Sequence, residues 1–337
     1  MEILISFIIP FIILLTIVVF IHEYGHYYFA KKYGVGVTDF SIGFGKEIFG
    51  FNDKSGTRWK FCAIPLGGYV KFFGDRNVFS QAEQEELLKE YNEEDRKKLF
   101  VVKPLYQRSL IVAAGPFANF LLAIVIFAFI YMFAGKDFTP AKIQEVQLES
   151  PAYTAGIKSG DVIKSINQRE VKSIMEVSTF INASSSETID IQIIRNGNEL
   201  TLKVKPKFIE GEDSLGNKIN KKIIGIKIAP LNEEINKQRL GPATALFYAV
   251  KETWFVIEAS WEFVISMFKG TGDTSQLGGP IKIAKITGQV AKFGVVAFLS
   301  IMAYISISLG FINLFPIPML DGGHLMFYAF EKILGRP

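Results

Sequence analysis

The residues best suited to chemistry stand together near the start of the chain, in the pentapeptide His22-Glu23-Tyr24-Gly25-His26. Two histidines four residues apart lie on one face of a helix, where both imidazoles can bind one zinc ion. Glu23 is placed between them, where a carboxylate can take a proton from a metal-bound water. His22 and His26 are therefore the predicted metal ligands, and Glu23 is the predicted catalytic base.

A catalytic zinc ion normally takes three protein ligands, so a third is expected elsewhere in the chain. The 28 residues from Phe293 to Leu320 carry no charge, and Asp321 follows them directly. An acid in that position is costly without a partner, and zinc would supply one. His324 is the rival ligand, and it could instead orient a ligand through a hydrogen bond. The residues by themselves leave Asp321 and His324 level.

The candidate metal ligands lie at the ends of stretches that could cross a membrane. Three uncharged apolar stretches have the length of about 20 residues that crosses a bilayer. They are Ile3–Ile21, Ser109–Ala134 and Phe293–Leu320. The 337 residues are 49% hydrophobic and 21% charged, which indicates spans combined with at least one soluble domain. The lipid bilayer is thus an expected partner, and the mild net charge of +4 gives no reason to expect a nucleic acid.

The basic residues near the span ends predict an orientation, because cytosolic loops are enriched in lysine and arginine. Those that count are Lys31, Lys32, Arg96, Lys97, Lys98, Lys103 and Arg108. They place residues 31–108 in the cytosol and residues 136–292 outside. His26 and Asp321 then lie at the same, cytosolic, end of their spans, so that the two could meet inside the membrane.

The cytosolic segment is expected to begin as β structure. Short alternating runs flank the turn Asn52–Gly56, which predicts a cytosol-side β-hairpin element. A charged helix is expected over residues 80–98. The single cysteine, Cys62, excludes an intramolecular disulfide and is interpreted as a small apolar residue in a strand.

The external segment has two parts. Residues 140–230 predict a compact α/β module, with a tight hairpin turn at Asn196-Gly197. Apolar residues recur at helical spacing over residues 243–268, and Trp254 and Trp261 are among them. This pattern favours an amphipathic helix at the membrane interface, and a helix packed on the module is the alternative.

Together these motifs resemble the site-2 protease family (peptidase family M50), and within it the bacterial RseP-type intramembrane zinc metalloproteases. The family's HExxH motif corresponds to His22–His26, and its Leu-Asp-Gly motif to Leu320–Gly322. Further family motifs occur here in the same order, at Gly43–Gly45, Gly67–Lys71, Ala114–Phe120 and Asn313–Pro318. The resemblance covers nearly the whole chain.

The resemblance implies that Asp321 is the third zinc ligand and that zinc is the cofactor. It implies that Asn313 positions the substrate or its transition state, and that the β segment at Gly67 and Gly68 pairs with an unwound substrate strand. The expected substrates are single-pass transmembrane proteins, of the anti-sigma factor or signal-peptide remnant type. The expected location is the bacterial inner membrane, with the active site near the cytosolic side.

The external module resembles a PDZ domain, on the pattern of Ser150–Ile163. Such a domain would lie on the periplasmic side and accept an extended peptide along a sheet edge. Two departures from the family stand out. RseP-type proteins carry two PDZ domains in tandem, where this loop has room for one, and they continue into a fourth transmembrane helix beyond the position of Pro337.

The expected fold is an α-helical multi-pass membrane protein with an inserted α/β PDZ domain and a cytosol-side β-hairpin element. The expected segments are transmembrane helix 1 (1–30), the cytosolic β segment and charged helix (31–108), transmembrane helix 2 (109–135), the PDZ domain (140–230), the interfacial helix and linker (240–292) and transmembrane helix 3 (293–337). The alternatives are a catalytically silent PDZ scaffold and a membrane metal-binding or transport protein. A transporter needs polar residues along several spans, and the first and third offer almost none.

Overall fold

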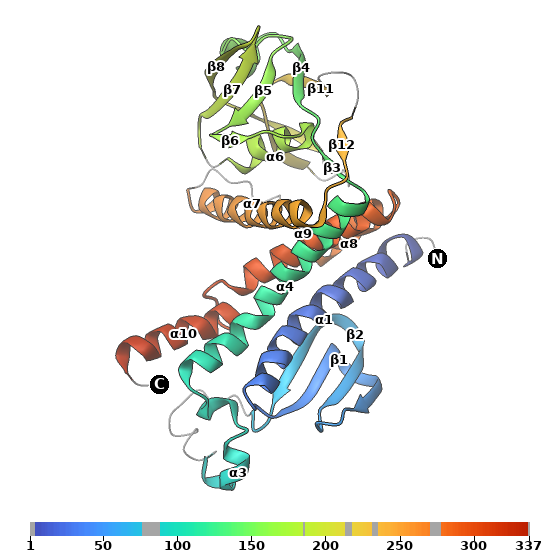
Figure 1. Ribbon diagram of the computed structural model, residues 1–337, viewed down its shortest axis with the longest axis vertical. Coiled ribbons are helices and arrows are strands. Elements are labelled where there is room, and N and C mark those ends of the chain that lie inside the picture. The colour runs from blue at the N-terminus through green and yellow to red at the C-terminus, as the bar shows by residue number, and fades with distance from the viewer. Residues whose placement is uncertain are drawn as a thin grey trace. The chain divides into compact units, whose positions relative to one another are not determined.

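Two compact units make up the chain, one of Met1–Ile126 with Thr287–Pro337 and the other of Phe127–Ile286. The computed structural model describes residues 4–75, 88–184, 186–212, 218–230, 235–269 and 278–335. The first unit consists of long apolar helices with a two-stranded sheet, and the second is built around a larger β-sheet (Figure 1).

Three helices in the described part of the chain are long and apolar enough to cross a membrane, as predicted. They are η1 and α1 (Leu4–Ile8 and Ile9–Lys32), α4 (Leu105–Phe133) and α9 (Val295–Asn313). The first transmembrane helix was expected over residues 1–30, with the pentapeptide on it. The helix continues through the pentapeptide to Lys32, because no glycine pair or proline interrupts residues 22–32.

The third span is shorter than predicted. The sequence indicated Phe293–Leu320, whereas α9 ends at Asn313 and a turn covers residues 314–320. Pro316 and Pro318 have no backbone N–H and cannot continue the helical hydrogen bonds. The chain therefore leaves the helix, and α10 (Asp321–Leu334) begins at the acidic residue itself.

Small residues allow the helices of the first unit to pack closely. A Cβ on Gly25 of α1 would lie 2.8 Å from the carbonyl carbon of Ala114 in α4. A Cβ on Gly310 of α9 would lie 2.8 Å from the carbonyl oxygen of Pro116 in α4. Such backbone approach is typical of helices that associate in a bilayer. The central helix α4 therefore contacts both α1 and α9.

The two-stranded sheet lies beside α1 (Figure 1). It consists of β1 (Val37–Asn52) and β2 (Arg58–Phe72), on either side of the turn that the sequence indicated. The strands bend, so that the first part of β1 pairs on one side with Arg58–Phe61 and on the other with Gly68–Phe72. The segment Gly68–Phe72 is therefore the outer strand of this sheet, on the side of α1.

The predicted charged helix over residues 80–98 is wrong as a continuous element, and residues 80–87 lie outside the described residues. α3 is a single turn (Glu93–Arg96), and η2 follows it (Phe100–Val102). The side chain of Asn92 accepts a hydrogen bond from the N–H of Asp95 at 2.9 Å. Asparagine competes for backbone donors in this way, so it begins a new helix instead of continuing one.

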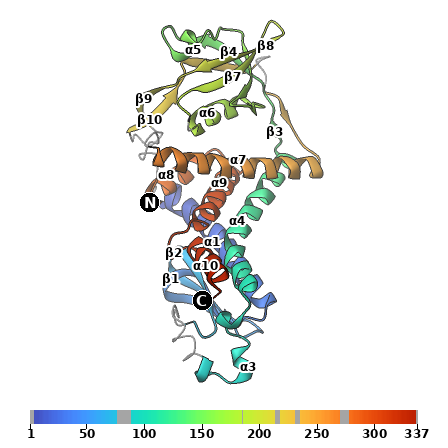
Figure 2. The same ribbon diagram turned by 90° about the vertical axis from the view of Figure 1, so that its left-hand side faces the viewer.

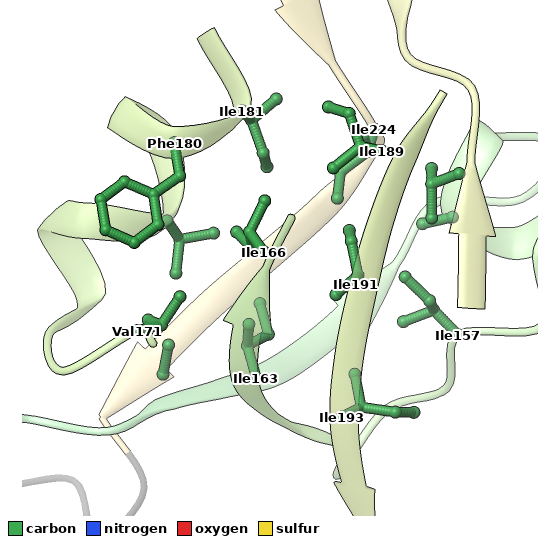
Figure 3. Packing of buried hydrophobic residues seen from close by; sticks show 14 of the residues in the cluster. Ile157, Ile163, Ile166, Val171, Phe180, Ile181, Ile189, Ile191, Ile193 and Ile224 are labelled. Atoms are coloured by element: carbon green, nitrogen blue, oxygen red, sulfur yellow. The ribbon is translucent and has the colours of Figure 1, made fainter. Parts of the chain in front are cut away.

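The second unit contains a six-stranded sheet in the order β11-β4-β5-β7-β8, with β6 paired to β5. Its strands are β4 (Ala141–Val146), β5 (Val162–Ile166), β6 (Arg169–Glu170), β7 (Ile189–Arg195), β8 (Asn198–Val204) and β11 (Ile226–Pro230), and its helices are α5 (Pro151–Thr154) and α6 (Ile174–Ala183). Smaller pairs are β9 (Lys207–Glu212) with β10 (Lys218–Ile223), and β3 (Lys136–Asp137) with β12 (Lys237–Gln238). Buried isoleucines of β5 and β7 pack with Phe180 and Ile181 of α6 to form the core (Figure 3).

The hairpin turn predicted between β7 and β8 is confirmed. Asn196 and Gly197 both have positive φ angles, 51° and 83°, and Arg195 pairs with Asn198 across the turn. Two central residues with positive φ characterise the type I′ turn, whose twist matches that of the flanking strands.

The helix predicted over residues 243–268 is α7 (Pro242–Phe268), and its inner face packs on α6 (Figure 2). The ring centroids of Phe180 and Phe255 lie 5.0 Å apart, and Arg169 forms ion pairs with Glu258 at 3.0 Å and Glu262 at 2.6 Å. The alternative expectation, packing on the module, therefore holds for this face. The opposite face exposes Leu246, Phe247, Val250, Trp254, Trp261 and Phe268.

The segment after α7 was expected to be a linker, and the structure corrects this for its second half. α8 (Pro280–Ala291) is a helix of three turns. A Cβ on Gly288 of α8 would lie 2.7 Å from the Cα of Phe7. The close packing of α8 on the first turns of the N-terminal helix is a tertiary contact, which local sequence composition does not reveal.

A buried carboxylate in the module makes its stability testable. Asp161 is 1% exposed, and Arg195 donates to both of its oxygens at 2.7 Å. Changing Arg195 to Met leaves this carboxylate without its cation, so we expect the free energy of unfolding to fall by about 2–4 kcal/mol. Hydrogen exchange of the β5 and β7 amides measures the effect.

Lys164 of β5 provides the control, because its ion pair with Glu199 is exposed. Changing Lys164 to Met should alter the free energy of unfolding by less than about 1 kcal/mol. Equal effects of the Arg195 and Lys164 substitutions would contradict the importance assigned to the buried pair.

Candidate metal centre

α1 aligns the two histidines of the pentapeptide. His22 and His26 are one helical turn apart and buried, and their Nε2 atoms lie 3.3 Å from each other. Two ligand atoms bound to one zinc ion at about 2.0–2.1 Å in tetrahedral geometry lie roughly 3.3 Å apart. The imidazoles therefore have the separation that a shared metal ion requires.

Asp321 completes the group from the other end of the chain. Its Oδ2 lies 3.1 Å from Nε2 of His22, and its Oδ1 lies 3.5 Å from Nε2 of His26. In the described part of the chain, these three side chains form the one group of histidine, cysteine and acidic residues that could hold a metal ion. The structure thus brings together three of the predicted site residues, across almost 300 positions of sequence.

The tautomer of His26 is determined by its second ring nitrogen. Nδ1 of His26 lies 2.9 Å from the carbonyl oxygen of Ile111 in α4. A carbonyl can only accept, so Nδ1 carries the proton and donates it. With its proton held on Nδ1, the neutral ring has its lone pair on Nε2, on the side of the group, which is the tautomer that binds a metal there.

The tautomer of His22 depends on Asn119, which is fully buried in α4. The side-chain amide of Asn119 lies 3.2 Å from Nδ1 of His22, and the backbone oxygen of Asn119 accepts a hydrogen bond from Ser306 of α9 at 2.9 Å. As drawn, Oδ1 of Asn119 has no hydrogen-bond partner. Rotating the amide by 180° lets Oδ1 accept the Nδ1 proton of His22 and frees Nε2 for a metal.

The donor set fits a cation. Two imidazole lone pairs and a carboxylate converge within 4.8 Å, and Oδ2 of Asp321 is buried without a hydrogen-bond donor. Two imidazoles and a carboxylate are a donor set that zinc prefers, and a cation bound among them would satisfy Oδ2 of Asp321.

Gly115 of α4 provides the space for the histidines. A Cβ at this position would collide with the ring of His26 and would lie 2.9 Å from Nε2 of His22. Position 115 requires glycine, because the imidazole rings lie directly against the backbone of α4 there.

Glu23 lies on the neighbouring face of α1, close to the group and to the outer strand of β2. His26, His22 and Asp321 all act electrostatically on its carboxylate. A carboxylate beside three metal-binding side chains can take a proton from a water held among them.

The other predicted site residues lie at different distances from the group. Nδ2 of Asn313 is 3.5 Å from Nε2 of His22, a contact at the limit of a hydrogen bond. A Cβ on Gly68 would lie 3.0 Å from Cγ of Glu23, so Gly68 lets the strand approach α1, while Gly67 packs under the ring of Phe44. His324, the rival ligand, is exposed and outside the group.

Three residues of α4 were missed as members of the site: Ile111, Gly115 and Asn119. Gly115 and Asn119 belong to the motif Ala114–Phe120, so the signal was visible as a motif. Its meaning was not, because the contact with α1 arises only when the helices pack.

Comparison with known proteins shows the family of this chain. The model of Peptidase family M50 matches residues 10–337. The chain belongs to this family. A "putative zinc metalloprotease" of Mesorhizobium japonicum is 42% identical over 332 residues, covering 98% of this chain and 90% of the relative. A "putative zinc metalloprotease" of Agrobacterium fabrum is 41% identical over 332 residues (98% and 88% covered), and metalloprotease MmpA of Caulobacter vibrioides is 34% identical over 345 residues (96% and 86% covered).

Among solved structures, the PDZ domain of an SdrC-like protein from Listeria monocytogenes is 21% identical, with a TM-score of 0.22. The match covers 27% of this chain and 88% of that chain. The corresponding PDZ domain from Listeria innocua is 24% identical, with a TM-score of 0.21 and coverage of 26% and 92%.

Gly115 offers a test of the centre that leaves every ligand in place. We expect Gly115→Ala to bind less than about one tenth of the zinc that the unaltered chain binds, because the new methyl group displaces both imidazoles. Metal content after purification measures this. Gly279→Ala is the control, since a Cβ there meets nothing within 4 Å. Full zinc content in the Gly115 variant would refute the placement of α4 against the histidines.

Proposed function

We propose that this protein is a zinc metalloprotease that hydrolyses peptide bonds within the membrane. The observation that carries the proposal is the convergence of His22, His26 and Asp321, with Glu23 beside them, on helices apolar enough to span a bilayer. Relatives that carry the words zinc metalloprotease in their names support the choice of metal.

In this mechanism, His22, His26 and Asp321 would hold a zinc ion, whose Lewis acidity would favour the attack of water on the scissile carbonyl near neutral pH. Glu23 accepts a proton from that water and returns it to the departing amine. Asn313, whose amide points at the same group, is placed to donate a hydrogen bond to the substrate carbonyl.

The position of the group on an apolar helix supports cleavage inside the bilayer. His22 and His26 belong to the apolar helix Ser6–Lys32, and 28% of the residues in its apolar window are buried, so most of its side chains are free to face lipid. We therefore propose single-pass transmembrane proteins as substrates, of the anti-sigma factor or signal-peptide remnant type. Such a substrate helix must unwind first, because helical amides are hydrogen-bonded.

The outer strand of β2 offers a place for the unwound substrate. The segment Gly68–Phe72 pairs with β1, and Gly68 brings it close to Glu23 of α1. A substrate added as a further strand would recover the backbone hydrogen bonds lost on unwinding. The sheet also exposes apolar side chains suited to lipid or to a transmembrane segment, at Phe44, Ile48, Phe49, Phe51, Phe61, Ile64 and Leu66.

For the module of the second unit we propose a PDZ domain on the periplasmic side of a bacterial inner membrane. β11 is an edge strand of its sheet, and α6 contacts it. A strand edge beside a helix is the arrangement that receives an extended peptide. The active site would then lie nearer the cytosolic side, and the exposed tryptophans of α7 would rest in the membrane interface.

The base is tested by Glu23→Gln, which keeps the size of the side chain and removes its ability to accept a proton. We expect cleavage of a model transmembrane substrate in proteoliposomes to fall at least about 100-fold, with zinc content unchanged. Tyr24→Phe is the matched control, because Tyr24 is an exposed neighbour on the same helix. Cleavage by the Gln variant at the rate of the unaltered chain would overturn the mechanism.

A further inference from the structure

A second contact, away from the metal ligands, joins α4 and α10, which are far apart in the sequence. Arg108, near the start of α4, forms an ion pair with Glu331 of α10, and the two side chains are 12% and 19% exposed. Nε of Arg108 also donates to the carbonyl oxygen of Lys103 at 3.1 Å, and its guanidinium lies 5.1 Å from the ring centroid of Tyr328. The guanidinium is thus held in place from three sides.

On α10, the partners of Arg108 share a face with the metal ligand. Asp321, Tyr328 and Glu331 recur at i, i+7 and i+10, which places them along one side of a helix. At 1.5 Å per residue, Glu331 lies about 15 Å along the axis from Asp321. The carboxylate that faces the histidines and the carboxylate that faces Arg108 therefore belong to one rigid element.

Among the described residues of α10, only two are buried. Gly322 and Gly323 pack against the backbone of the turn at residues 314–318, and they are the buried residues of this helix. Its other face exposes Phe327, Phe330, Ile333 and Leu334. The helix is therefore anchored at its first turn, beside Asp321, and again at Glu331.

On α4, Arg108 likewise shares a face with the residues that support the histidines. Arg108, Gly115 and Asn119 recur at i, i+7 and i+11, along one side of the helix. Arg108 lies about 10 Å along the axis from Gly115. The side of α4 that touches His22 and His26 is thus the side that binds α10.

We propose that Arg108 and Glu331 are positioning residues that hold Asp321 in place as a metal ligand. The ion pair fixes the rotation and tilt of α10 against α4, so that the carboxylate faces the two imidazoles before the metal arrives. This inference rests on the proposed metal centre. A ligand that is already ordered loses less freedom on binding, so a loosened α10 should weaken zinc affinity although all three ligands remain.

The test is the zinc affinity of the full chain in detergent micelles, measured by competition with a chromophoric chelator. Arg108→Ala and Glu331→Ala should each weaken the affinity about tenfold or more. The double variant Arg108→Glu with Glu331→Arg restores an ion pair in the reverse sense and should recover most of the loss. Lys98→Ala removes an ion pair with Asp95 at an exposed position and should leave the affinity unchanged.

A second measurement covers the case in which the reversed pair does not fold. Glu331→Gln keeps the shape of the side chain, and its cobalt-substituted form should show an altered visible spectrum, which reports the geometry of the ligands. Unchanged affinity and spectrum in the single variants would overturn the inference. A His22→Ala variant that binds as much zinc as the unaltered chain would refute the metal centre itself, and this result is distinct from the loss of the positioning role.

Discussion

Two imidazoles and a carboxylate converge in the interior of an apolar helix bundle, and a cation held among them would satisfy all three. His22 and His26 reach the point from α1, and Asp321 reaches it from the start of α10. Residues of α4 support the positions of the two histidines. Gly115 leaves room for the rings, and Asn119 and the carbonyl of Ile111 set which ring nitrogen faces inward.

The second unit is stabilised by a buried hydrophobic core. Its sheet and α6 enclose a core of isoleucines, valines and one phenylalanine, as in a soluble domain. The polar contacts that matter there are the buried pair of Asp161 with Arg195 and the pairs between Arg169 and α7.

Part of this could be predicted from the sequence, and the reasons are physical. His22 and His26 follow from helical spacing, and the Asn196-Gly197 turn follows from the φ angles that only a few residues accept. Asp321 could not be separated from His324 by chemistry, since both side chains bind zinc. Asp321 is half-buried beside the histidines and His324 is exposed, and these positions depend on the turn that precedes α10. Contacts between helices, such as those of α4 with α1, leave no periodic trace in the sequence.

The central claim is that Asp321, and not His324, is the third ligand. The most direct measurement is the zinc content of purified Asp321→Ala and His324→Ala variants, determined by atomic emission beside the unaltered chain. The account predicts that the Asp321 variant loses its zinc and that the His324 variant keeps about one ion per chain. Zinc retained in the first variant and lost in the second would contradict it.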